Sequence, residues 1–200
     1  MSAEGQGSAD RRTGPHRRRG GSMTARDRFF LDKSDPGSWR ALNGLAGTVA
    51  DAAEEAGVSR AVLELVNVRI SQLNGCAYCL DLHVRYAVKA GVSSQQLAVL
   101  TSWREAEALY SDLERAALAV GEAATVLPEE PARTAELAAA REALTDEQFS
   151  ALQWAAVTMN AFNRISILSR HPVRSRGGAK AAAATAPATP APASVPGGGA

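Results

Sequence analysis

The only two cysteines of this sequence, Cys76 and Cys79, stand three residues apart, and His83 follows four residues later. Residues three and four apart share one face of a helix, so a helix here would align both thiols and the imidazole. A C-x-x-C pair can cycle between dithiol and disulfide, with one thiolate attacking a peroxide or a disulfide and the other displacing the product. The pattern therefore indicates redox exchange.

A carboxylate on a neighbouring helix could hold the imidazole in orientation while it accepts a thiol proton. Glu64 is the candidate, because the short Asn74-Gly75 connection predicts that the helices before and after it pack antiparallel. At 1.5 Å of rise per residue, Glu64 and His83 lie at comparable depth from this turn. The spacing permits a contact, but the rotation of each helix decides whether the two side chains face one another.

Two other interpretations of these residues stay open. Cys76, Cys79 and His83 could supply three zinc ligands with Glu64 or His171 as a fourth, although structural zinc sites usually draw paired ligands from separate loops. Alternatively, the cysteines could simply pack in the core, since unpaired cysteine is among the most buried residue types. Only the combined spacing of the four residues favours chemistry over packing.

The elements that must position these residues are predicted to be helices. Aromatic residues make up only 5% of the chain and alanine is frequent, which favours an all-α fold of close-packed helices. Apolar residues recur at helical spacing, and capping residues and glycines mark the helix ends. We expect helices over residues 39–56, 60–73, 76–90, 94–103, 112–126, 132–143 and 146–170.

The sequence predicts one domain between two tails. Residues 1–25 form an arginine-rich, disordered basic tail, residues 26–172 form the domain, and residues 173–200 form a disordered Ala/Pro-rich tail. Met23 opens a more ordinary sequence, so residues 1–22 are either an incorrectly assigned start, a remnant of an expression tag or a genuine basic arm, and the sequence alone does not distinguish these. Five arginines in the first tail predict only weak, salt-sensitive attraction to nucleic acid and no specific recognition. With no apolar stretch of about 20 residues and no secretory signal, we expect no membrane partner and a cytoplasmic location.

The pattern resembles a known family. Glu64, eleven residues, Cys76-Ala77-Tyr78-Cys79, three residues and His83 are similar to the redox-active branch of the alkylhydroperoxidase D and carboxymuconolactone decarboxylase superfamily. Residues 69–83 and 159–164 extend the likeness, which spans roughly residues 28–172. One departure is clear: alkylhydroperoxidase D has a second histidine between its cysteines, where this sequence has Tyr78.

The resemblance implies an alkylhydroperoxidase-like helical domain that acts as a thiol-dependent hydroperoxide reductase, a peroxiredoxin-type antioxidant activity. Cys79 would attack the peroxide, Cys76 would resolve it, and Glu64 with His83 would form a proton relay. A helix-dipole argument alone would instead make Cys76 the more acidic thiol. The decarboxylase branch lacks the cysteine pair, so lactone decarboxylation is not expected.

The same resemblance implies the partners. We expect a hydroperoxide substrate, an external dithiol reductant of the lipoyl or thioredoxin type, no metal or organic cofactor, and a homotrimer or homohexamer. The alternative function is a disulfide reductase or a redox-sensing helical module with little peroxidase turnover. Turnover of a hydroperoxide in the presence of a dithiol separates these hypotheses.

Overall fold

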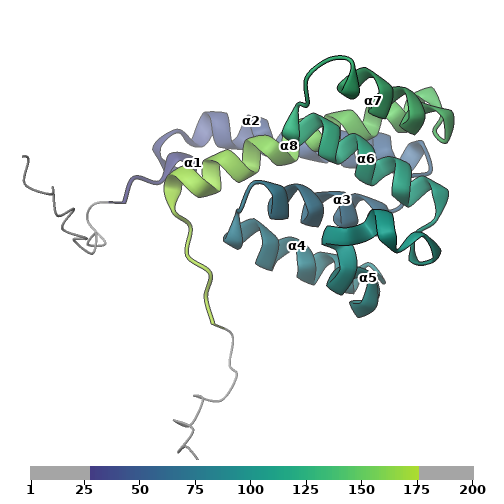
Figure 1. Ribbon diagram of the computed structural model, residues 1–200. Helices are drawn as coiled ribbons and strands as arrows, with labels where there is room; N and C mark the ends of the chain where they lie inside the picture. Colours follow the sequence, from purple (N-terminus) through teal and green to yellow (C-terminus); the bar gives the residue numbers. More distant parts are fainter. Residues whose placement is uncertain (1–27, 176–200) are drawn as a thin grey trace, which may run out of the picture.

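The computed structural model describes residues 28–175, and all regular structure in this part of the chain is helical (Figure 1). The prediction of an all-α fold is therefore confirmed. The proposed N-terminal tail and the part of the Ala/Pro-rich tail from residue 176 onward lie outside the described residues. The helices are α1 (Leu31–Ser34), α2 (Pro36–Glu55), α3 (Arg60–Leu73), α4 (Ala77–Lys89), α5 (Ser94–Val99), η2 (Leu100–Glu105), η3 (Glu107–Leu109), α6 (Asp112–Val126), α7 (Ala132–Glu142) and α8 (Asp146–Ser169).

Most helix ends lie where the capping residues predict them. The side chains of Ser59, Ser93 and Thr145 cap α3, α5 and α8, and the last two form reciprocal capping boxes. Gly75 and Gly91 have positive φ angles directly after the residues that end α3 and α4. Glycine adopts this conformation without the steric cost of a side chain, which explains both helix stops.

Two boundaries differ from the prediction. Helix α2 begins at Pro36 rather than near Trp39, because Asp35 accepts hydrogen bonds from the first free N–H groups and proline suits the first helical turn. The helix expected over 94–103 is α-helical only to Val99 and continues as the 3₁₀ helix η2. Residues three apart are eclipsed in a 3₁₀ helix, so Leu100 and Trp103 are both buried on one side.

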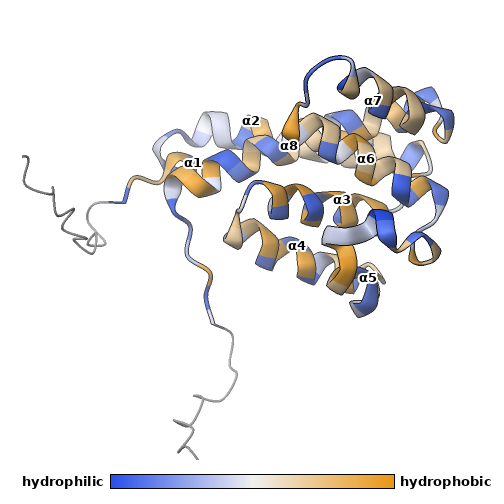
Figure 2. Cartoon of the chain, viewed as in Figure 1, coloured by the Kyte–Doolittle hydropathy of each residue, from blue (hydrophilic) through white to orange (hydrophobic). Residues whose placement is uncertain are grey.

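Helix α3 lies at the centre of the molecule and separates two parts of the core. One of its faces packs against α6 and α8 through Val66 and Ile70, and another packs against α4 and η2 through Leu65 and Val68. In Figure 2 the ribbon of α3 is largely in the orange of hydrophobic residues, interrupted by blue hydrophilic segments. A helix that is apolar on several faces must be enclosed, and this enclosure also buries the polar side chains of Glu64 and Ser71. Across residues 28–175, no helix is both long and apolar enough to cross a bilayer.

Candidate active site

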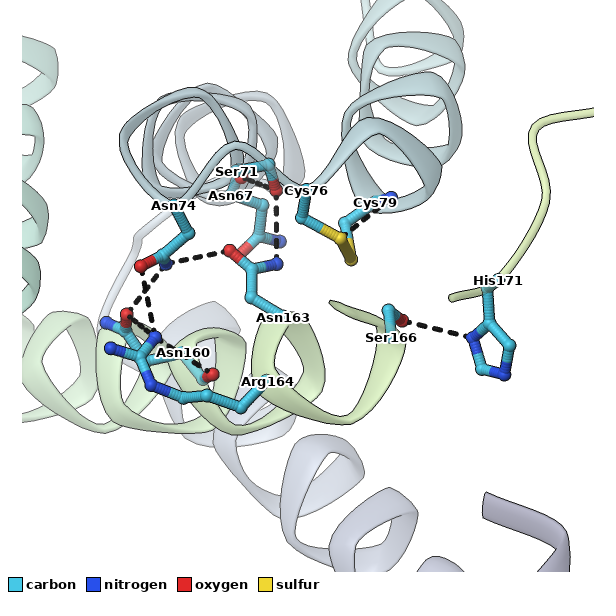
Figure 3. The surroundings of a disulfide bond; sticks show 10 residues. All are labelled: Asn67, Ser71, Asn74, Cys76, Cys79, Asn160, Asn163, Arg164, Ser166 and His171. Carbon is cyan, nitrogen blue, oxygen red and sulfur yellow. Dashed lines mark hydrogen bonds between the residues drawn. A yellow bond between two sulfur atoms is a disulfide. The ribbon is translucent and has the colours of Figure 1, made fainter. Parts of the chain in front are cut away.

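The two cysteines form a disulfide at the start of α4 (Figure 3). Cys76 is the N-cap residue, and its sulfur accepts a hydrogen bond from the Cys79 backbone N–H at 3.3 Å. Both residues are buried, with 2% and 3% of their surface exposed. The predicted placement at the first helical turn is thus found, and the unsatisfied N–H groups there would stabilise a thiolate after reduction.

The structure brings Glu64 and His83 together. Helices α3 and α4 pack against each other, and Glu64 Oε2 lies 2.7 Å from His83 Nδ1. A carboxylate only accepts hydrogen bonds, so Nδ1 carries the proton and Nε2 is the basic nitrogen of the neutral ring. The Glu64 side chain is fully buried and the His83 side chain is 14% exposed. This arrangement fixes both the tautomer and the orientation of the imidazole.

Arg60 is a third member of this group that the sequence analysis missed. Its Nη2 lies 2.5 Å from Glu64 Oε1, in an ion pair without hydrogen-bond alignment. The signal was present in the sequence, because Arg60 and Glu64 are four residues apart on one helix. The Arg60 side chain is 57% exposed, so it offsets the buried negative charge of Glu64 while remaining partly solvated. The carboxylate therefore has a cation on one side and an imidazole on the other.

A cavity of about 400 Å³ opens beside these groups. Cys79 and His83 line it, whereas Cys76 and Glu64 lie behind them and are not part of the wall. Much of the wall is apolar and comes from α2, α3, α4 and α8: Trp39, Val49, Leu63, Leu82, Met159 and Phe162. A molecule in this cavity would meet Cys79 before Cys76.

Trp39 and Phe162 pack edge to face with ring centroids 5.5 Å apart. Both rings also form part of the cavity wall. Thr158 lies on the same wall, and its buried Oγ1 has no hydrogen-bond partner among the described residues. Buried hydroxyl groups normally have a partner, so Thr158 is suited to bind a polar atom of a molecule in the cavity.

A network of amides holds the turn that precedes Cys76 against α8 (Figure 3). The Asn74 side chain donates to Asn160 Oδ1 and to Asn163 Oδ1, each at 2.8 Å. Asn163 is fully buried and also donates to Ser71 Oγ at 3.4 Å. The backbone of Cys76 in turn donates to the carbonyl of Ser71. This network fixes the position of the disulfide relative to α8.

The zinc interpretation finds no support in the geometry. Within the described part of the chain, no group of three or more His, Cys, Asp and Glu side chains is arranged to hold a metal ion. His171, the alternative fourth ligand, lies instead against Asp32 and Ser166. The sulfur atoms that zinc would need are joined to each other.

Comparison with known proteins agrees with this geometry. The sequence model of the carboxymuconolactone decarboxylase family matches residues 39–123. The chain is 35% identical over 114 residues to the uncharacterized protein YdfG of Bacillus subtilis, covering 57% of this chain and 77% of that protein. It is also 39% identical over 67 residues to the uncharacterized protein YnjA of Escherichia coli, covering 34% of this chain and 36% of that protein.

A solved structure is similar over nearly its whole length. It is a protein of unknown function from Agrobacterium tumefaciens, described as a candidate antioxidant defence protein AhpD, with a TM-score of 0.64 and 30% sequence identity. The match covers 74% of this chain and 99% of that one. The identity to YdfG and to the Agrobacterium protein over most of their lengths, the shared fold and the Cys76–Cys79 pair lead to one conclusion: the chain belongs to the carboxymuconolactone decarboxylase family and is alkylhydroperoxidase D-like.

Proposed function

We propose that this protein is a thiol-dependent hydroperoxide reductase that works through a Cys76–Cys79 dithiol–disulfide cycle. One observation carries the proposal: Cys79, half of a disulfide, shares a cavity wall with His83, whose ring is oriented by the buried Glu64. A cavity, a nucleophile and an oriented base are the parts that such a reaction needs. The antioxidant description of the Agrobacterium protein fits the same activity.

In the first step the reduced protein reacts with a hydroperoxide. His83 Nε2 accepts the Cys79 thiol proton, and Glu64 stabilises the imidazolium that forms. The thiolate attacks the terminal oxygen of the substrate, so that an S–O bond forms while the O–O bond breaks. The products are a sulfenic acid on Cys79 and an alcohol. Cys79 is chosen over Cys76 because only Cys79 reaches the cavity wall.

In the second step Cys76 restores the disulfide. Its thiol gives up a proton as its sulfur attacks the Cys79 sulfur, the S–S bond forms while the S–O bond breaks, and the departing hydroxide takes up that proton and leaves as water. An external dithiol then reduces the disulfide through a mixed disulfide and leaves oxidised itself. Because Cys79 is 3% exposed, a slender dithiol such as a lipoyl arm reaches it more easily than the surface of a thioredoxin-type protein. No metal or organic cofactor takes part in this cycle.

The cavity also indicates the kind of hydroperoxide. Its walls include large apolar side chains, with a few polar groups such as Thr158 among them. Sites of this composition bind the apolar part of a small molecule and orient its polar end. We therefore propose an organic hydroperoxide as the substrate.

We also propose that the protein forms a homotrimer or homohexamer in the cytoplasm. Helix α8 leaves Trp154, Val157 and Leu168 more than half exposed. Large apolar side chains grouped on one helix are typical of subunit contacts. A reducing compartment would supply the dithiol that the cycle consumes.

The test is steady-state reduction of cumene hydroperoxide with dihydrolipoamide, comparing the wild type with Cys76→Ser, Cys79→Ser and His83→Ala. Turnover should be lost in both serine variants and reduced by about 10²–10⁴-fold in His83→Ala, the usual contribution of a positioned acid or base. The two serine variants form a matched pair. After one equivalent of hydroperoxide, Cys76→Ser should carry a sulfenic acid that a dimedone probe labels, and Cys79→Ser should not.

Other results would reject the proposal. Wild-type turnover no faster than the dithiol alone excludes the peroxidase. In that case, rapid reduction of a model disulfide would indicate the disulfide reductase, and slow reaction with both would leave the redox-sensing module. Labelling of Cys79→Ser rather than Cys76→Ser would show that Cys76 attacks the hydroperoxide and Cys79 resolves the sulfenic acid.

A further inference from the structure

A second chain of polar groups lines the same cavity. His171 Nε2 lies 3.0 Å from Asp32 Oδ1, and His171 Nδ1 lies 3.3 Å from Ser166 Oγ. Asp32 belongs to α1, Ser166 to α8, and His171 to the segment that follows α8. All three line the cavity together with Cys79 and His83. In the sequence, His171 is a candidate only as a zinc ligand, and no local pattern points to the other two.

The imidazole of His171 is held in a fixed orientation. Its ring stacks on Phe30 with centroids 5.7 Å apart, and Tyr78 packs on it at 5.1 Å. Tyr78 lies directly before Cys79, so the packing ties His171 to the start of α4. Figure 3 shows Ser166 and His171 on the side of the disulfide away from the amide network around Asn74.

These contacts could transfer a proton toward the cavity. The carboxylate of Asp32 accepts the Nε2–H, and it pairs with the imidazolium when the ring carries a second proton. Nδ1–H of that imidazolium can donate to Ser166 Oγ, while the Ser166 hydroxyl donates its own proton into the cavity. The His171 and Asp32 side chains remain 13% and 16% exposed, so solvent can return the proton to the ring. Ser166 is buried among the apolar wall residues and faces the cavity.

We propose that Asp32, His171 and Ser166 form a second proton relay, which protonates the alkoxide that leaves when Cys79 attacks a hydroperoxide. This proposal rests on the proposed function. It identifies the groups that give a proton to the leaving oxygen when Cys79 reacts with the hydroperoxide. As the S–O bond forms and the O–O bond breaks, the departing RO⁻ takes the Ser166 proton, and Ser166 takes the proton of His171 Nδ1. Asp32 keeps the remaining Nε2–H in place, and the alcohol is released.

The two proton transfers use different walls of the cavity: removal of the thiol proton takes place at α4, and protonation of the leaving oxygen takes place at α8. His83 lies on α4, the helix that also carries the attacking sulfur, one turn beyond Cys79. The leaving oxygen departs in line with the attack and therefore away from that sulfur. Ser166 is presented by α8 on another wall, with a proton source behind it. Thr158, a second hydroxyl on α8, has no such source among the described residues and is suited to binding alone.

A serine hydrolase is the other chemistry that these three residue types can perform. That reaction needs backbone N–H groups aimed at an oxyanion beside the serine. Ser166 lies within α8, where the N–H groups are bonded along the helix. The geometry therefore favours proton transfer over nucleophilic attack by Ser166.

The test varies the leaving group of the peroxide. The pre-reduced wild type, His171→Gln and Ser166→Ala would be mixed with cumene hydroperoxide or with peracetic acid in a stopped-flow instrument. An alkoxide is a strong base that needs a proton as it leaves, whereas acetate is a weak base that does not. In both variants, the ratio of the cumene hydroperoxide rate constant to the peracetic acid rate constant should fall by about 10²–10⁴-fold, the range for a positioned acid.

Ser169→Ala is the matched control. Ser169 is a buried serine on the same helix, one turn from Ser166, and its Oγ accepts a hydrogen bond from Leu31 N at 3.0 Å. It supports α1 without lining the cavity, so its loss should leave the ratio unchanged. Equal slowing with both peroxides in His171→Gln and Ser166→Ala would mean a structural role and overturn the relay while the peroxidase stands. Wild-type protein that reacts with neither peroxide would overturn both proposals.

Discussion

Replacing Glu64 by glutamine tests how much the buried charge beside His83 contributes. The substitution keeps the size of the side chain and one hydrogen-bond acceptor for His83 Nδ1, but it removes the negative charge. The new amide group would point its N–H atoms toward Arg60, whose side chain is 57% exposed and can turn into solvent. The variant should therefore fold and retain the His83 contact. What it loses is stabilisation of the imidazolium that forms when His83 accepts the thiol proton.

The size of this loss follows from the contact. A hydrogen bond to a charged group contributes about 1.5–3 kcal/mol and a neutral one about 0.5–1.5 kcal/mol, so the change costs roughly 1–2 kcal/mol. At 1.36 kcal/mol for each factor of ten, oxidation of the reduced protein by hydroperoxide should slow by about 5- to 30-fold. His83 is only 14% exposed, so solvent offers little compensation.

Stopped-flow oxidation of pre-reduced protein measures this rate directly, and thermal melting reports on folding. Glu122→Gln is the matched control, because Glu122 is also a largely enclosed carboxylate, 12% exposed, with cationic partners and does not line the cavity. Its rate should stay within twofold of the wild type. If Glu64→Gln also stays within twofold, or if both variants slow equally, the role given to the Glu64 charge is wrong.

Three further predictions concern stability. Although burial raises the pKa of Glu122, hydrogen bonds from Arg104, Trp103 and Arg69 lower it below its ordinary value of 4.5. The Glu122 carboxylate therefore binds a proton more readily in the unfolded chain than in the folded one. Its contribution to the free energy of unfolding is full above pH 4.5 and is lost as the pH falls through the folded-state pKa. The melting temperature of the wild type should therefore fall toward that of Glu122→Gln in acid, and a constant difference would contradict this. Gly121→Ala would place a methyl group 3.0 Å from Val66 Cγ1. The overpacking should destabilise the fold by about 1–3 kcal/mol, which exceeds the roughly 1 kcal/mol by which alanine is favoured over glycine within a helix. A lower melting temperature is expected for this variant. An unchanged melting temperature would show that α3 and α6 can move apart enough to accommodate the methyl group. Asn163→Ala should reduce the free energy of unfolding in urea by about 1–3 kcal/mol, because it removes a partner from buried polar groups, and a loss under 0.5 kcal/mol would contradict this.

Local signals explain why the helices could be predicted. Ser59, Ser93 and Thr145 satisfy N–H groups within three residues of themselves, and Gly75 and Gly91 stop helices through their own backbone conformation. Such effects depend on neighbours in the sequence alone. The change from α5 to η2 was missed because it depends on burying Leu100 and Trp103 against other helices.

The residues of the candidate site also divide into those that local spacing predicts and those that only tertiary packing brings together. Its four predicted residues could be named from spacing, and Arg60 could have been added from its position four residues before Glu64. Asp32 and Ser166 gave no such signal, since they come from segments 139 and 5 residues away from His171. Only the packing of α1 against α8, and of α8 against α4, brings them to the cavity.

The sequence by itself determined the helical class of this protein, most helix ends and the alignment of Cys76, Cys79 and His83 on one helix. These features follow from periodicity and capping, which act over one or two turns. Tertiary structure alone decided that Glu64 meets His83, that Cys79 and not Cys76 faces a cavity, and that Asp32, His171 and Ser166 share it. Each depends on how one helix is rotated against another, and that rotation is set by the packing of the whole core.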